Sequence, residues 1–412
     1  MVLTSSIKPP SERFKQLLYD ILNLMKIGID GRLWNETGVG RYIRNLVKNL
    51  AEIDDKNDYV LFVRDPQKVK VGTSPARNAL PEAAASLQAG SHSDAGGNFK
   101  IVKADIRWHS AEEQTVLPGI LLKENLDLMH FPYFSVPVLY HRKFVVTIHD
   151  LIIDHFSTGQ ATTLPLPFYR AKRIGYKLIM RQVAQKAAKI ITVSNATKDE
   201  IMKLLKVSSD SIVVTHEGVD SGLYSSSEHK RVEKFSTGSN NTPYLLYVGN
   251  AYPHKNLERL IEAFSSVNKT SSAKLIFVGK EDYFYKRLKQ QNLTSNIIFK
   301  DHVSDEELRE LYRNAKALVI PSLMEGFGLP ALEAMANGCL VIASDIPALR
   351  EVCGEAAIYV NPFDPKDLAD KMESVLKHDF SEKKTLGEKQ AQKFSWEKMA
   401  KETLKIYQEV IG

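Results

Sequence analysis

The chain has 412 residues, of which 43% are hydrophobic and 25% charged, and it carries a formal net charge of +6. This composition is that of a globular protein long enough for roughly two or three domains. The modest charge is no argument for a nucleic-acid partner, and no run approaches the roughly 18 to 20 apolar residues of a membrane span. Cys339 and Cys353 lie in apolar segments without metal-ligand spacing, which predicts buried free thiols and fits a cytoplasmic location.

Strand and helix patterns alternate along the first half of the chain, after an N-terminal extension at residues 1–24. Short apolar runs predict strands at 27–30, 59–63, 101–102, 128–131, 144–148 and 190–193. Helical patterns lie between or beside these strands, at 45–51, 111–125, 169–188 and 198–205. Such alternation favours a mostly parallel sheet with helices on both faces. Residues 66–99, rich in Pro, Ala, Ser and Gly, interrupt the rhythm and are expected to form a surface insertion.

A second break, at about 221–242, is rich in Ser, Asn, Gly and charged residues, and the alternation restarts after it. Further strands are predicted at 244–248, 274–278, 297–299, 318–320 and 341–343, and helices at 257–265, 329–336 and 398–410. Ser395 is the expected N-cap of the last helix. We therefore expect two doubly wound, Rossmann-like domains at 25–222 and 243–393, followed by a C-terminal segment at 394–412. Ligands of such sheets bind at the carboxyl ends of the strands, which predicts a site in a cleft between the domains.

Two glutamates bracket the start of the helix predicted at 329–336. Glu325 falls on the loop after a buried strand, and Glu333 lies about two turns into the helix. Open backbone N–H groups at this helix start favour anions, and they belong to Phe327, Gly328 and Leu329. Two carboxylates that accept hydrogen bonds from hydroxyl groups, with unpaired backbone amides between them, suit the binding of a nucleotide-sugar. The alternative interpretation is a pair of solvated acids that complement the helix dipole.

The string from Glu325 to Glu333, EGFGLPALE, closely resembles the E-x7-E signature of retaining glycosyltransferases of family four. The resemblance covers roughly residues 25–410 and is strongest from 244 to 362. It implies the α/β GT-B fold, in which two Rossmann-like domains face a cleft and the last helix crosses back onto the first domain. It also implies a retaining, metal-independent transfer of a hexose from a nucleotide-sugar, without a cofactor.

The resemblance assigns catalytic roles to three residues. Lys255 matches a lysine that neutralises the diphosphate leaving group, while Glu325 and His149 orient the transferred sugar. His149 and Asp150 end a predicted strand, which places them at the ligand-binding edge of the sheet. A histidine in such a position is also commonly structural, and a lysine after a proline turn is commonly solvated.

The resemblance also predicts donor-binding residues in both domains. A glycine-rich turn at Gly38 and Gly40 lets the backbone approach phosphate, with a plain tight turn as the alternative. Asn250 stands where the family has an arginine, and His254 or Arg41 is expected to supply the missing charge. The resemblance assigns the contact with the ribose to Glu333 and the contact with the base to Val303. Further donor contacts are assigned to the backbone amides of Phe327, Gly328 and Leu329.

Residues around Asn250, at 253–256 and at 30–32 look most like bacterial mannosyltransferases of surface-polysaccharide (O-antigen) assembly. That points to GDP-mannose as the donor and to a saccharide or lipid-linked saccharide as the acceptor. A UDP- or ADP-sugar donor and a non-catalytic sugar-nucleotide-binding relative stay open as alternatives. A nicotinamide-dependent oxidoreductase would also alternate strands and helices, but Ile43 stands where its fingerprint has the third glycine.

No Asp-x-Asp pair or His/Cys/Asp cluster has metal-ligand spacing, so no required metal is expected. Asp54 and Asp55 are interpreted as solvated residues of a connection, and Glu217, where the family usually has asparagine, as part of the interdomain structure. The helix predicted at 169–188 carries basic residues at Arg170, Lys172, Arg173, Lys177 and Arg181. This pattern fits peripheral contact with an anionic membrane, and equally an ordinary solvated face over a core stripe.

Overall fold

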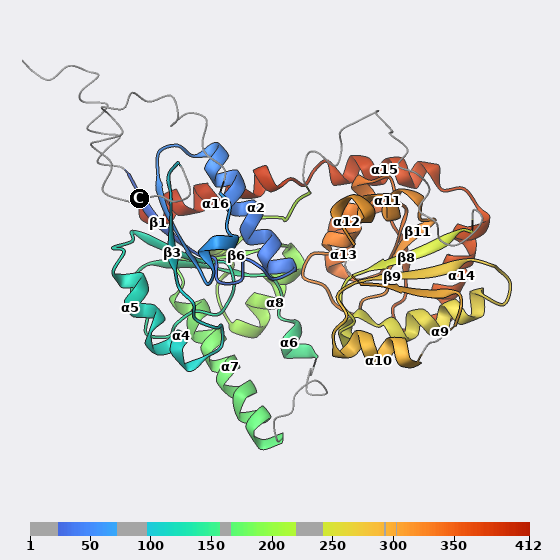
Figure 1. Ribbon diagram of the computed structural model, residues 1–412, viewed down its shortest axis with the longest axis horizontal. Coiled ribbons are helices and arrows are strands. Elements are labelled where there is room, and N and C mark those ends of the chain that lie inside the picture. The colour runs from blue at the N-terminus through green and yellow to red at the C-terminus, as the bar shows by residue number, and fades with distance from the viewer. Residues whose placement is uncertain (1–23, 72–96, 157–165, 220–241, 292–293, 302) are drawn as a thin grey trace, which may run out of the picture. The chain divides into compact units, whose positions relative to one another are not determined.

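The computed structural model (Figure 1) describes residues 24–71, 97–156, 166–219, 242–291, 294–301 and 303–412, with the backbone alone for 166–173. The chain divides into two compact units. The first contains Met1–Thr147, Lys186–Lys189 and Thr403–Gly412, and the second contains Ile148–Gln185 and Ile190–Glu402. The N-terminal extension, the predicted insertion and the break at 221–242 lie outside the described residues, except at their edges.

Within the described ranges, seven strands form a first sheet in the order β3-β2-β1-β4-β5-β6-β7. Their bounds are Lys26–Asp30 (β1), Asp58–Val63 (β2), Phe99–Lys103 (β3), Leu128–Phe131 (β4), Phe144–Ile148 (β5), Lys189–Thr192 (β6) and Ile212–Val214 (β7). Strand β1 pairs in parallel with β2 and β4, so that Ile27 faces Tyr59 on one side and Leu128 on the other. The chain order reverses at β1 and β4, as in doubly wound sheets.

The helices that accompany this sheet in sequence are Gly38–Ile53 (α2), Ala111–Thr115 (α4), Leu117–Leu122 (α5), Ile152–His155 (α6), Leu166–Lys186 (α7) and Asn195–Leu205 (α8), with 3-10 turns at Pro66–Lys68 and Ser209–Ser211. In the first unit α2 lies on one face of the sheet, and α4 and α5 lie on the other (Figure 1). The single helix predicted over 111–125 is two helices, because Pro118 has no N–H to continue the hydrogen-bond ladder.

The second unit contains a sheet of six described strands in the order β10-β9-β8-β11-β12-β13. Their bounds are Tyr244–Val248 (β8), Lys274–Val278 (β9), Ile297–Lys300 (β10), Ala317–Ile320 (β11), Val341–Ser344 (β12) and Ile358–Val360 (β13). The helices are Leu257–Val267 (α9), Tyr283–Gln291 (α10), Asp305–Asn314 (α11), Leu329–Ala336 (α12), Pro347–Cys353 (α13), Pro365–Lys377 (α14) and Ser381–Ala391 (α15), with 3-10 turns at Pro253–Lys255 and Gly354–Ala356.

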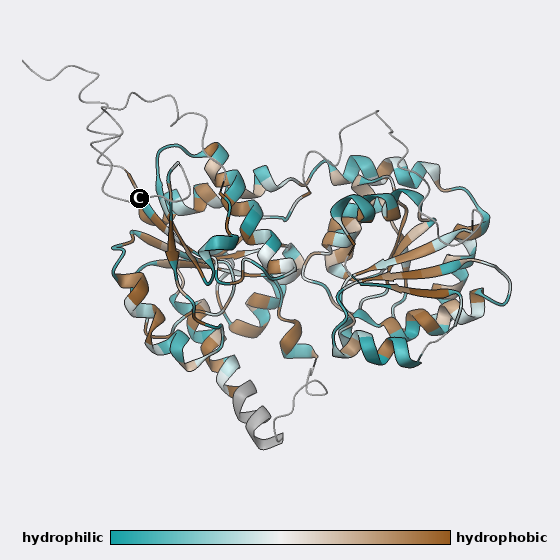
Figure 2. Cartoon of the chain, in the orientation of Figure 1, coloured by the Kyte–Doolittle hydropathy of each residue, from teal (hydrophilic) through white to brown (hydrophobic). Residues whose placement is uncertain are grey.

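Two apolar cores cover the two faces of this second sheet. Helices α9, α10 and α14 pack on one face, and α11, α12, α13 and α15 pack on the other (Figure 1). All four residues of β11 are buried, as expected for a parallel strand covered on both faces. Figure 2 shows the result, with apolar strands inside and hydrophilic outer faces on the helices. Cys339 and Cys353 are buried free thiols, as predicted.

The last helix, Trp396–Ile411 (α16), begins at the predicted cap, because Ser395 Oγ accepts a hydrogen bond of 3.1 Å from the Lys398 N–H. Its final residues belong to the first unit. There the Tyr407 hydroxyl lies 2.6 Å from Nδ1 of His130 on β4, and both side chains are buried. The C-terminal end of α16 is therefore part of the core of the first unit.

Candidate active site

The chain order of the second sheet reverses between the neighbouring strands β8 and β11. Ligands of doubly wound sheets bind outside the carboxyl ends of the strands at such a reversal. Asn250 and Lys255 follow β8, while Glu325 and the glycine-rich signature loop follow β11. The fold therefore brings two segments that are far apart in sequence to one edge of the sheet.

Lys255 and Glu325 form an ion pair at this edge. Lys255 Nζ lies 2.7 and 2.9 Å from the two carboxylate oxygens of Glu325, and the two side chains are 16% and 10% exposed. The Ser322 hydroxyl donates a further bond of 2.6 Å to Oε1 of Glu325. Burial alone would raise the pKa of Glu325, but the charge and hydrogen bonds of Lys255 and the Ser322 bond hold this pKa below its ordinary value. Two of the three predicted catalytic residues are thus in direct contact.

Glu333, the second glutamate of the signature, is buried on α12. Its Oε2 atom accepts a hydrogen bond of 2.9 Å from the hydroxyl of Tyr312 on α11. Since Glu325 and Glu333 are both largely buried, the alternative of two solvated helix-start acids is wrong. The predicted contact of Glu333 with a ribose stays a prediction.

His149, the third predicted catalytic residue, follows β5 and lies beside the signature loop within the second unit. A Cβ atom at Gly326 would collide with the carbonyl oxygen of His149, so only glycine fits at this point of the loop. The carbonyl oxygen of Gly326 accepts bonds of 2.6 Å from Ser194 Oγ and 3.1 Å from Thr197 Oγ1, at the start of α8. Burial raises the pKa of the neighbouring Asp150 carboxyl.

The segment after β8 holds no second cation beside Lys255 among its own residues. The side-chain oxygen of Asn250 accepts a bond of 3.3 Å from the N–H of Tyr252. His254 is buried, and burial together with the adjacent Lys255 charge lowers its pKa to about 4. His254 is therefore neutral at pH 7 in the enzyme without donor, and its expected replacement of the family's arginine stays a prediction.

The other predicted donor residues occupy defined places. Phe327 packs its ring into the core against Phe394, with centroids 5.7 Å apart, and Leu329 lies partly buried against the same core. Gly328 directly precedes α12. Val303 follows β10 and is also packed against this core. Two further glycines, Gly38 and Gly40, lie in the first unit and in the first turn of α2, rather than in a turn before it. Their donor-binding role stays a prediction.

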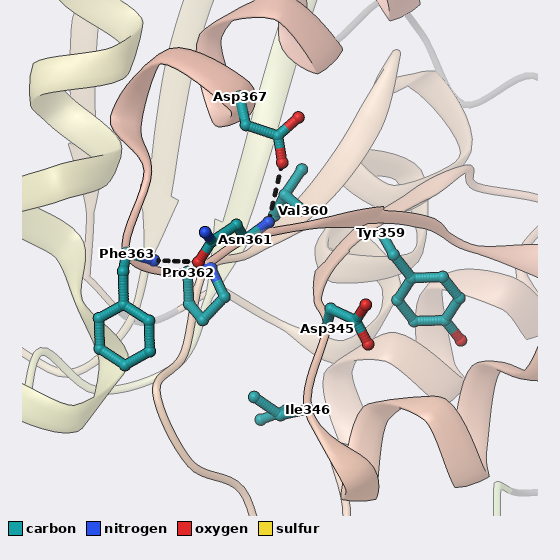
Figure 3. Close-up of a pocket in the computed structure, with 8 residues that line it drawn as sticks. All are labelled: Asp345, Ile346, Tyr359, Val360, Asn361, Pro362, Phe363 and Asp367. Atoms are coloured by element: carbon teal, nitrogen blue, oxygen red, sulfur yellow. Dashed lines mark hydrogen bonds between the residues drawn. The ribbon is translucent and has the colours of Figure 1, made fainter.

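A separate cavity of about 520 Å³ lies at the carboxyl ends of β12 and β13. Figure 3 shows its lining residues, Asp345, Ile346, Tyr359, Val360, Asn361, Pro362, Phe363 and Asp367. Asp367 accepts a bond of 2.8 Å from the Asn361 N–H, and both oxygens of Asp345 are bound by Arg350. None of the predicted catalytic residues lines this cavity.

Sequence reasoning missed the residues that hold the site together. Ser322, Ser194 and Thr197 are small hydroxyl residues that follow strands, and the sequence patterns described above assign none of them a role. No group of three or more metal-ligating side chains is present in the described part of the chain. Over the same residues, no helix combines the length and the apolar character needed to cross a membrane.

Comparison with known proteins bears on this geometry. A family model described as Glycosyltransferase Family 4 matches residues 37–223, and one described as Glycosyl transferases group 1 matches residues 229–393. The O-antigen chain mannosyltransferase RfbU of Salmonella typhimurium is 30% identical over 266 residues, which are 63% of this chain and 67% of that protein. O-antigen chain mannosyltransferase B of Escherichia coli is 30% identical over 293 residues, which are 68% of this chain and 74% of that protein.

Solved structures show the same architecture. Anabaena Alr3699/HepE, solved in complex with UDP-glucose, aligns with a TM-score of 0.67 at 16% identity, over 93% of this chain and 100% of that one. This structural similarity shows the fold of the chain, which is GT-B, as expected from the sequence. With two family models matched along its length and two relatives at 30% identity that it covers to 67% and 74%, the chain belongs to the family-four glycosyltransferases.

Proposed function

We propose that this enzyme is a retaining mannosyltransferase that moves mannose from GDP-mannose to a saccharide or lipid-linked saccharide during polysaccharide assembly. The observation that carries the proposal is the Lys255–Glu325–Ser322 cluster at the reversal between β8 and β11. The names of the two O-antigen mannosyltransferase relatives support the choice of sugar and pathway class.

In the proposed mechanism the bond between the sugar's anomeric carbon and the diphosphate oxygen breaks first. Lys255 and the backbone amides of Phe327 and Gly328 stabilise the charge that develops on the departing diphosphate. The acceptor hydroxyl then attacks the same face of the sugar, which retains the anomeric configuration. Its proton passes to an oxygen of the departing phosphate, so no protein nucleophile takes part.

The ion pair also defines a role for Glu325. Because Lys255 and Ser322 keep the pKa of Glu325 low, this carboxylate is ionised at neutral pH and can accept hydrogen bonds from sugar hydroxyl groups. When donor binds, Lys255 lies between two anions, the Glu325 carboxylate and the diphosphate. No metal ion is needed in this arrangement, since the lysine and the helix-start amides carry the leaving-group charge.

A UDP-sugar donor is the second candidate, and the UDP-glucose complex of Anabaena Alr3699/HepE favours it. Thermal-shift and transfer assays with GDP-mannose, UDP-glucose and an ADP-sugar distinguish the two, because a bound donor raises the unfolding temperature. We expect stabilisation and transfer with GDP-mannose, and activity that persists in excess EDTA. Preference for a UDP-sugar would reject the donor, and loss of activity on chelation with rescue by Mg²⁺ or Mn²⁺ would reject the metal-free mechanism.

We also propose peripheral contact with an anionic membrane through α7. Ile174 and Leu178, four residues apart on this helix, are 61% and 65% exposed, and basic residues lie beside them in the sequence. An ordinary core stripe would bury both side chains. Co-sedimentation with vesicles of anionic phospholipid tests this contact. The double substitution Ile174→Asp and Leu178→Asp should abolish the binding, and equal binding to purely zwitterionic vesicles would contradict an anionic surface.

A further inference from the structure

The loop that follows β7 is fixed from two sides. Val219 forms a parallel β-bridge with Ser395, at the start of α16. A Cβ atom at Gly218 would collide with the backbone of Ser395 and Trp396, so the two chain segments are in direct backbone contact. At the other end of the loop, the Thr215 N–H donates a bond of 2.8 Å to the carbonyl oxygen of Thr192 on β6. The two residues between these anchors, His216 and Glu217, are thereby held in place.

His216 and Glu217 each pair with a residue from another element. His216 Nε2 lies 2.7 Å from Oε1 of Glu351 on α13, and its ring lies 6.1 Å from that of Phe327. Glu217 pairs with His149, with 3.3 Å between its Oε1 atom and Nδ1 of the histidine. The Glu351 contact is partly solvated, whereas Glu217 and His149 are both buried.

The buried pair determines which way the His149 ring faces. A carboxylate at Nδ1 favours the tautomer with the proton on that nitrogen, and it fixes the orientation of the ring. Nε2 is then the nitrogen that can meet a hydroxyl group as a hydrogen-bond acceptor. A carboxylate that orients a histidine in this way acts through the histidine, without touching the substrate.

We propose that Glu217 is a positioning residue. It holds the His149 ring in the tautomer and direction with which His149 orients the transferred sugar. The inference rests on the proposed function, because it takes from it the contact of His149 with the donor sugar. It gives a role to the position where this chain departs from the family's asparagine. Asparagine is shorter and uncharged, so it offers no carboxylate to the ring.

A double-mutant cycle between Glu217 and His149 tests the proposal. The variants are Glu217→Gln, His149→Ala and the double variant, assayed for transfer from GDP-mannose and for the affinity of GDP alone. Glu217→Gln should lower kcat/KM about tenfold or more, while GDP affinity stays within a factor of two. In the His149→Ala background the same substitution should change kcat/KM by less than about twofold, because the imidazole ring through which Glu217 acts is absent.

Glu200→Gln is the matched control, since it removes the carboxylate of another His–Glu pair, 3.1 Å from His155 on the surface of the second unit. Its kcat/KM should equal that of the wild type. A normal kcat/KM in Glu217→Gln, or effects of Glu217→Gln and His149→Ala that simply add, would overturn the positioning role. A loss of GDP affinity in Glu217→Gln would do so too, because it indicates general disruption of the site.

Failure of the proposed function gives a different result. If the wild-type enzyme transfers from another nucleotide-sugar, GDP-mannose is rejected as the proposed donor. The double-mutant cycle can still be measured with that other donor. If the wild-type enzyme transfers sugar from no nucleotide-sugar, the cycle is measured on binding instead. The quantity compared is then the affinity for the nucleotide-sugar that binds, divided by the affinity for the same nucleotide without the sugar. A wild type that binds no nucleotide-sugar rejects the proposed function and the positioning role together.

Discussion

The Lys255 ammonium contacts both oxygens of the Glu325 carboxylate, so neither charge is left alone in its partly buried surroundings. Removing one partner of such a pair costs up to about 3–5 kcal/mol, because the other charge stays without compensation. We expect Lys255→Met and Glu325→Gln each to lower the free energy of unfolding. The double variant should lose less than the sum of the two, as urea denaturation would measure; strict additivity would show that the pair is not coupled.

Turnover should depend on Lys255 more than donor binding does. The negative charge on the diphosphate grows in the transition state, so Lys255→Ala should lower kcat by about 10²-fold or more with a smaller change in donor KM. Steady-state kinetics measure this split. Asn250→Arg in the Lys255→Ala background should recover part of kcat, and a near-normal kcat in Lys255→Ala itself would place the diphosphate elsewhere.

Glu333 offers a second test of the donor site. Glu333→Gln keeps the size of the side chain but removes its charge, so nucleotide affinity should weaken by roughly 1–3 kcal/mol if the carboxylate accepts ribose hydroxyl groups. Tyr312→Phe is the control, because it removes the hydrogen bond to Glu333 but leaves the carboxylate. Calorimetry should find nucleotide affinity nearly unchanged in the control, and unchanged affinity in Glu333→Gln would dismiss the ribose contact.

The buried His254 should make stability depend on pH. Its pKa is about 4 in the folded enzyme, against an ordinary value of 6.5, so the unfolded chain binds a proton first as the pH falls. The stabilisation from neutral His254 is complete above about pH 6.5 and is lost progressively down to about pH 4. His254→Gln lacks this titration, so its unfolding free energy should fall less over the same range. Parallel curves for the two proteins would contradict the assignment.

Gly326 should tolerate no side chain. Gly326→Ala places a methyl group against the His149 carbonyl oxygen, where the backbone must move, and transfer activity should fall together with thermal stability. Gly119 in α5 is the comparison, since an added Cβ meets nothing within 4 Å there and alanine favours a helix. Gly119→Ala should keep full activity, whereas an active and stable Gly326→Ala would show that the loop has room.

Local sequence patterns predicted the elements around the site well. The strands β4, β5, β8 and β9 and the helix α12 have the predicted bounds, because each is a continuous apolar run or a run of good helix formers. Strands β7 and β13 were missed, since three residues give no period to detect. The polar helices α10 and α11 were missed as well, because their apolar residues are few.

Contacts between distant residues were beyond the sequence. The ion pair of Lys255 and Glu325 follows from the adjacency of β8 and β11, which no local pattern records. Asp54 was interpreted as solvated, and this is wrong: it is buried and accepts bonds from the hydroxyl of Tyr59 at 2.5 Å and from Asn57 at 2.7 Å. The sequence shows that Tyr59 and Asn57 are close to Asp54 along the chain, but it does not show that their side chains point toward the Asp54 carboxylate.

The contact between His130 and Tyr407 joins residues that are 277 positions apart. Closing so long a loop delays the contact relative to those made within the second unit. During synthesis, strands β1 to β5 are made before the second unit, yet their core lacks Tyr407 until residue 407 has been added. The second unit also draws on residues as far along as Glu402, so neither unit has its complete core until the last helix has been synthesised.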